Sequence, residues 1–179
     1  MATTTILTGA QFDALPYEEG RQLELIDGEL LIVGSATGRH QLIVQAILLE
    51  LGLYFRANSG VGLALADVEL ALSGNHRLRP DVTVFTSQKV PAIDLDHVPI
   101  PLAPDLAIEV ISPSERTFDS QRKLLAYLHN GAEEVWQVFP ELKSVMIHRR
   151  DTARTIEGES TIDTPLLPGF RLPLATVFA

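Results

Sequence analysis

Two acidic residues stand in stretches whose other side chains are almost all apolar. Glu109 interrupts Leu106–Ile111, where both alternating sets of side chains are otherwise apolar, and Asp81 precedes a similar stretch over 82–85. A strand that is apolar on both faces is typical of the centre of a sheet, where a carboxylate is costly unless it is paired or metal-bound. If the two strands are neighbours, both carboxylates converge on one site, and such hard oxygen ligands suit Mg²⁺ or Mn²⁺.

Each acid also has a structural interpretation, which the residues alone leave open. Glu109 would then lie at an exposed strand end or in an ion pair with an arginine, because structural networks also perturb carboxylates. Pro80-Asp81 would be a turn before a strand.

A lysine and a histidine are the other candidates for chemistry. Asp119, Lys123 and Tyr127 follow one another at four-residue spacing, so on a helix they form one stripe. Lys123 is then either the surface partner of Asp119 or a cation supplied to the end of the Glu109 strand. His40 opens the apolar face of a helix, as a core residue or as a site residue, and Glu24 lies in the hairpin before it.

The elements that must position these residues follow from hydrophobic periodicity and turn signals. A short helix with Thr8 as its N-cap covers 8–15, and a hairpin over Leu23–Val33 turns at Asp27-Gly28. Strands are expected over 60–72, 78–85, 105–112, 134–139 and 144–149. Helices are expected over 39–56 and from Ser112-Pro113-Ser114 to about His129, the second ending at Asn130-Gly131. Long irregular stretches are expected over 89–104 and 151–169.

From Arg39 onward the predicted order is α-β-β-β-α-β. This order predicts an α/β (α+β) fold with a mixed central sheet flanked by helices, to which an N-terminal hairpin and C-terminal strands are added.

Composition narrows the class of protein. The chain has 179 residues, a net charge of −9 and no cysteine, which predicts one domain over 1–179 and excludes thiol catalysis and cysteine metal sites. A cytoplasmic location is expected, since no stretch resembles a membrane span or a signal peptide. The acidic balance argues against nucleic-acid binding by bulk attraction alone.

The chain resembles the Uma2 family (DUF820) of restriction-endonuclease-like proteins, within the PD-(D/E)XK nuclease superfamily, whose shared core runs α-β-β-β-α-β. The resemblance covers nearly the whole chain. The matching residues are Glu24-Leu25-Ile26-Asp27-Gly28-Glu29-Leu30, His40, Arg79-Pro80-Asp81-Val82, Pro104-Asp105-Leu106, Glu109-Val110-Ile111-Ser112-Pro113-Ser114, Lys123, Tyr127, Gly131, Glu134-Val135-Trp136, Pro140 and Pro168-Gly169-Phe170.

The resemblance implies a role for each site residue. Asp81 and Glu109 would be the metal-binding acids, with the backbone carbonyl of Ile111 as a third ligand. Ile111 stands where the superfamily usually has its lysine, so the cation would come from Lys123 on the following helix. The remaining implied site residues, acting as acids or hydrogen-bond partners, are Glu24 and His40. Relatives of this fold often pair, so a homodimer is expected.

These residues predict a Mg²⁺- or Mn²⁺-dependent endonuclease that hydrolyses DNA. The alternative is a catalytically silent domain that keeps the nuclease fold and binds nucleic acid or a partner. A glycosidase that uses Asp81 and Glu109 as acid and base receives little support from a 6% aromatic content. A basic rim around the cleft would favour DNA, and its candidate members are Arg39, Arg56, Arg77, Arg79, Arg116 and Arg122.

Overall fold

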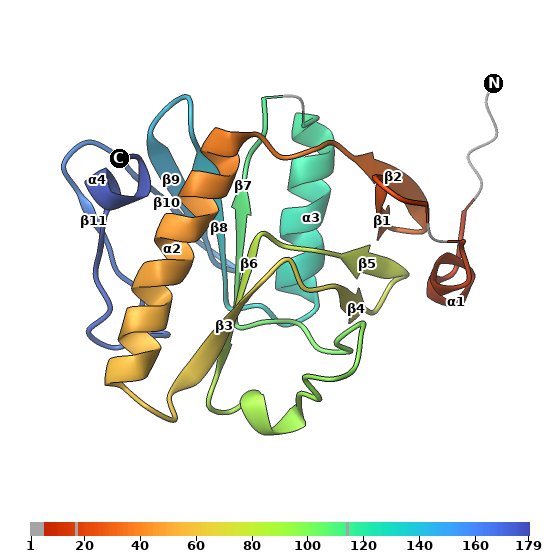
Figure 1. The fold of residues 1–179 in the computed structure, drawn as a ribbon, viewed down its shortest axis with the longest axis horizontal. Helices are drawn as coiled ribbons and strands as arrows, with labels where there is room; N and C mark the ends of the chain where they lie inside the picture. Colours follow the sequence, from red (N-terminus) through yellow and green to blue (C-terminus); the bar gives the residue numbers. More distant parts are fainter. Residues whose placement is uncertain (1–5, 17, 114) are drawn as a thin grey trace.

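The computed structural model describes residues 6–16, 18–113 and 115–179 (Figure 1). The first elements are the helix α1 (Gly9–Asp13) and the antiparallel hairpin of β1 (Gln22–Ile26) and β2 (Glu29–Val33). Thr8 caps α1 by accepting a hydrogen bond from the Gln11 amide, as predicted. Asp27 and Gly28 have φ angles of 51° and 81°, so the predicted two-residue turn, with both residues in the left-handed region, is confirmed.

The central sheet has six strands in the order β10-β9-β8-β7-β6-β3. Its strands are β3 (Gly62–Ala66), β6 (Val82–Thr86), β7 (Leu106–Val110), β8 (Glu134–Phe139), β9 (Ser144–His148) and β10 (Ala153–Ile156). β7 and β8 are parallel, and the other neighbours are antiparallel. The helices α2 (Gly38–Ala57) and α3 (Thr117–His129) pack against this sheet. Along the chain, these helices and the strands of this sheet follow the order α2-β3-β6-β7-α3-β8, which confirms the predicted core order α-β-β-β-α-β.

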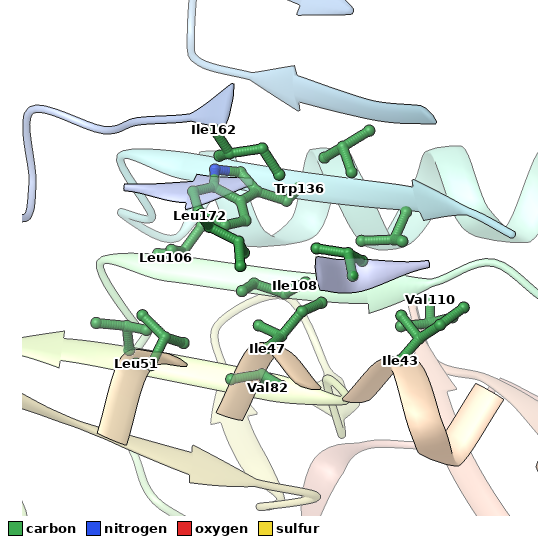
Figure 2. Close-up of a cluster of buried hydrophobic side chains, with 14 of the residues drawn as sticks. Ile43, Ile47, Leu51, Val82, Leu106, Ile108, Val110, Trp136, Ile162 and Leu172 are labelled. Atoms are coloured by element: carbon green, nitrogen blue, oxygen red, sulfur yellow. The ribbon is translucent and has the colours of Figure 1, made fainter. Parts of the chain in front are cut away.

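Helices α2 and α3 cover opposite faces of this sheet (Figure 1). On one face, Ile43, Ile47 and Leu51 of α2 pack with Val82, Ile108 and Trp136 of three neighbouring strands (Figure 2). On the other face, Leu124 and Tyr127 of α3 pack with Ala107 and Val135. Every residue of β7 is buried, so its prediction as a central strand is confirmed.

A second, four-stranded sheet corrects two predictions. Its order is β2-β1-β5-β4, with β4 at Leu70–Leu72 and β5 at His76–Leu78. The predicted strand 60–72 is therefore two strands in two sheets, because Asp67 adopts a left-handed conformation (φ 51°) between them. The predicted strand 78–85 begins only at Val82, since Leu78 belongs to β5 and Pro80 has no amide hydrogen for a ladder.

Other boundaries differ as well. Helix α3 begins at Thr117 rather than at Ser112-Pro113-Ser114, because the Glu115 amide closes a turn onto the Ser112 carbonyl first; Ser114 lies outside the described residues. The stretch 151–169, predicted irregular, contains β10 and also β11 (Thr161–Ile162), which pairs with β12 (Leu172–Pro173) before α4 (Leu174–Val177). Loop 89–104 contains a short 3₁₀ helix, Val90–Ala92.

No helix within the described ranges is long and apolar enough to cross a bilayer.

Candidate active site

The antiparallel register of β6 and β7 brings the two predicted acids together. Val82 pairs with Ile108, so continuing the register by one residue sets Asp81 opposite Glu109. Both residues line one cleft, with a volume of about 350 Å³, between the hairpin, the start of α2 and the start of α3. The convergence expected of these two residues is therefore present in the fold.

Asp81 is held by two donors. His40 Nε2 lies 2.8 Å from Asp81 Oδ1, and the Val110 amide donates to Oδ2 at 2.6 Å. The hydrogen bond to Asp81 raises the pKa of His40 above its ordinary value, against the opposing effect of burial. His40 is thus a partner of the site rather than a core residue, and it sits at the first turn of α2 because Thr37 caps that helix through the His40 amide.

Lys123 points into the same cleft. Its Nζ lies 2.7 Å from Glu24 Oε2 and 3.8 Å from both Glu109 Oε2 and Glu115 Oε1. The alternative, that Lys123 is the surface partner of Asp119, is wrong. Asp119 instead has Arg116 and Arg122 at 3.8 Å.

Glu109 is the most strongly perturbed acid of the cluster. The residue is 7% exposed, and Tyr127 donates a hydrogen bond to its Oε1 at 2.6 Å. Burial raises the pKa of Glu109 well above its ordinary value; Lys123 opposes this, but the neighbouring carboxylates of Asp81, Glu24 and Glu115 add to it. The site therefore holds more negative charge than its lysine balances.

The same carboxylates keep Lys123 charged. Burial alone would lower the pKa of its ammonium, but Glu109, Glu24 and Glu115 together raise it above its ordinary value. Glu24, on β1, also accepts a hydrogen bond from the Arg79 amide at 2.9 Å. Glu24, which lies on the hairpin, thus contacts both Lys123 and the segment that precedes Asp81.

Glu115 is the member that sequence reasoning missed. It lies in the turn between β7 and α3, and burial raises its pKa, partly offset by Lys123. No periodicity marks a residue in such a turn. The one available signal was its position two residues before Thr117, where the helix that carries Lys123 begins.

Ile111 lies between Val110 and Ser112, which both line the cleft, and only some of the expected arginines do so. Ile111 directly follows β7, and its amide donates to the Val138 carbonyl, but it is not among the residues that line the cleft. Of the six arginines expected to form a rim, Arg79 and Arg116 line the cleft. Arg77 pairs instead with Asp13, and Arg122 with Asp27 and Glu29.

The donor set fits a divalent cation by chemistry and by charge. Mg²⁺ is usually held by one or two carboxylates together with water and substrate phosphate, and Asp81 and Glu109 provide two carboxylates in a cleft with surplus negative charge. Within the described residues, no group of three or more acidic, histidine or cysteine side chains is arranged to hold a metal ion. A site of two carboxylates completed by water and phosphate does not require such a group.

Comparison with known proteins identifies the family of the chain. Residues 10–175 match the Uma2 family, described as "putative restriction endonuclease". The chain belongs to the Uma2 family, and the predicted relationship is confirmed.

A solved structure supports the fold class. The chain is similar to a structure described as a putative nuclease belonging to DUF820 from Anabaena variabilis ATCC 29413, with a TM-score of 0.83 and 21% sequence identity over 96% of this chain and 97% of the other. No curated protein matches the chain. The predicted fold class is thus confirmed.

Proposed function

We propose that the chain is a Mg²⁺- or Mn²⁺-dependent endonuclease that hydrolyses phosphodiester bonds in DNA. The observation that supports this most directly is the cluster of Glu24, Glu109 and Glu115 around the ammonium of Lys123, with Asp81 in the same cleft at the carboxyl end of β7. A fold maintained for stability alone would not favour such a surplus of buried negative charge, because each unbalanced carboxylate opposes folding.

Asp81 and Glu109 would hold the cation, with the Ile111 carbonyl as a further predicted ligand. When bound, a divalent cation polarises the phosphate and lowers the pKa of water that attacks it. His40 orients Asp81 through its Nε2 contact, and Tyr127 orients Glu109 through its hydroxyl. These contacts restrict both carboxylates to orientations that face the cleft.

Lys123 would stabilise the negative charge that develops on the phosphate. Glu24 Oε2 lies 2.7 Å from the Lys123 ammonium and holds it on the cleft side of α3. The negative charge of Glu24 also helps to keep Lys123 protonated. Lys123 thereby supplies the cation that Ile111 cannot supply. A cytoplasmic location and a homodimeric assembly stay predictions.

The decisive test is nicking of a supercoiled plasmid by the wild type in Mg²⁺, Mn²⁺ or EDTA, together with calorimetric titration of Mn²⁺. We expect nicking with either ion and none in EDTA, and we expect Asp81→Ala to bind Mn²⁺ at least about 100-fold more weakly. Absence of both nicking and Mn²⁺ binding would favour the alternative function, a silent binding domain of the same fold.

The role of Lys123 needs a separate variant. Lys123→Met alone leaves its carboxylate partners unbalanced, so it is paired with Glu24→Gln to limit the loss of stability. We expect the double variant to bind Mn²⁺ and to nick plasmid at least 100-fold more slowly than Glu24→Gln alone. Equal rates for the two variants would remove Lys123 from the mechanism.

A further inference from the structure

Phe118 is an exposed aromatic residue whose neighbours in the chain line the cleft. It lies in the first turn of α3, between Arg116 and Asp119, which both line the cleft, and it is 65% exposed. The guanidinium carbon of Arg122 lies 5.5 Å from the centre of its ring. One side of the ring therefore rests on a cation, while most of the ring is open to solvent.

The cation under the ring is itself fixed. Arg122 donates hydrogen bonds to Asp27 at 3.0 Å, Glu29 at 2.7 Å and the Ile26 carbonyl at 2.7 Å. All three partners belong to the β1–β2 hairpin, so Arg122 joins α3 to that hairpin. Phe118 is thus supported by an arginine that is itself fixed to the hairpin, and the same hairpin contributes residues to the cleft.

A second exposed apolar side chain borders the cleft from the hairpin. Ile32 of β2 lines the cleft and is 66% exposed. The charged lining is mainly acidic: Glu24, Asp67, Asp81, Glu109, Glu115 and Asp119 line the cleft in the described part of the chain, against Arg79, Arg116 and Lys123. Apolar side chains therefore border a cleft whose lining contains few basic side chains.

This balance disfavours fully paired duplex DNA as the substrate that enters the cleft, whereas a negatively supercoiled plasmid still offers locally unpaired segments. Duplex binding depends on lysines and arginines that neutralise many phosphates. Arg77 and Arg122 are engaged with acidic side chains, Arg79 pairs with Glu69, and the chain carries a net charge of −9. Proteins that bind single strands gain affinity from stacking of unpaired bases on aromatic rings, which duplex DNA cannot provide.

We propose that the cleft takes an unpaired DNA strand, with a base stacked on Phe118 and the adjacent phosphodiester directed toward Lys123. This inference rests on the proposed nuclease function and adds its substrate class. The cleft volume of about 350 Å³ lies at the small end of the range for ligand pockets.

The test measures binding and cleavage separately. The probe is a 20-nucleotide single strand carrying one 2-aminopurine, alone or annealed to its complement, with Ca²⁺ for binding and Mg²⁺ or Mn²⁺ for cleavage. We expect at least tenfold tighter binding of the single strand by the wild type and quenching of 2-aminopurine as it stacks. Phe118→Ala should weaken single-strand binding about tenfold and abolish the quenching, and Phe118→Trp should restore both.

Leu125→Ala is the matched control, because Leu125 is an exposed apolar residue further along the same helix. It should bind like the wild type, and circular dichroism of all variants monitors folding. Equal binding of both probes, or wild-type binding and quenching by folded Phe118→Ala, would overturn the inference even if plasmid is nicked. Stacking and Phe118-dependent binding without any cleavage would support the inference about the ligand and contradict the proposed nuclease function.

Discussion

The two ends of the parallel strand pair β7 and β8 treat buried acids in opposite ways. At the amino end, Asp105 pairs with Lys89 at 3.0 Å and accepts the Thr86 amide at 2.7 Å. In the same region, Glu134 accepts hydrogen bonds from Arg149 Nε at 2.7 Å and from Trp136 Nε1 at 3.0 Å. Each of these acids has its own base and its own hydrogen-bond donors.

At the carboxyl end, acids outnumber bases. Glu24, Glu109 and Glu115 share Lys123, and Asp81 adds a further carboxylate whose side-chain partner is His40. A carboxylate paired with its own base contributes to folding, whereas a surplus of carboxylates opposes folding until a cation arrives. Burial of an acid therefore does not by itself indicate function. A set of buried acids that outnumbers its basic partners does indicate function.

The largest effect is expected for Glu109→Gln. The substitution removes a metal-binding carboxylate and keeps its shape, so nicking should fall at least about 1,000-fold, equivalent to about 4 kcal/mol, while the protein stays folded. Plasmid nicking and circular dichroism measure the two quantities. The matched control is Glu134→Gln at the other end, which should keep the specific activity of its folded fraction. Comparable losses of activity in both variants would break the contrast between the two ends.

The next effect concerns stability at the amino end. Asp105→Asn should lower the free energy of unfolding by about 3 kcal/mol, because it separates a buried ion pair and sets an amide against the Lys89 ammonium. We take the lower end of the range for buried pairs because Lys89 is partly exposed. Urea denaturation checks this value. A loss below about 0.5 kcal/mol would mean that Asp105 resembles a surface acid.

A smaller effect is expected for Glu115→Gln. Glu115 adds negative charge to the cleft 3.8 Å from the Lys123 ammonium but is not one of the two proposed metal-binding acids, so Mn²⁺ affinity should fall about tenfold, or about 1.4 kcal/mol. Calorimetric titration measures it, with Glu133→Gln, a surface change outside the cleft, as the control. An affinity loss as large as that of Asp81→Ala would instead make Glu115 a direct ligand.

The smallest effect is a dependence of stability on pH without metal. The pKa of Glu109 is raised in the folded protein, so its ionisation opposes folding above the ordinary value of 4.5 and not below it. Glu109→Gln should therefore melt like the wild type near pH 4.5 and about 3 °C higher at pH 8, equivalent to about 1 kcal/mol. Thermal melts in EDTA at a series of pH values test this. A variant that melts lower at pH 8 would make Glu109 a structural partner of Lys123.

Much of the fold could be predicted from local sequence. The Asp27-Gly28 turn, the apolar face of α2 and the lone acid within Leu106–Ile111 each depend on neighbours within a few residues. The strand 134–139 was predicted at its observed bounds for the same reason. The sequence by itself therefore determined the order of the core and identified Asp81, Glu109 and Lys123 as candidates.

The tertiary structure decided which charges meet. Several contacts depend on how the hairpin docks against α3. Lys123 contacts Glu24 rather than Asp119, and Glu115 joins the cleft. Arg122 supports the ring of Phe118. The division of 60–72 between two sheets likewise depends on one left-handed residue, Asp67. Periodicity in the sequence indicates which side of a helix or strand is buried. Ion pairs between distant elements depend instead on sheet register and packing. Register and packing arise only when the whole chain folds.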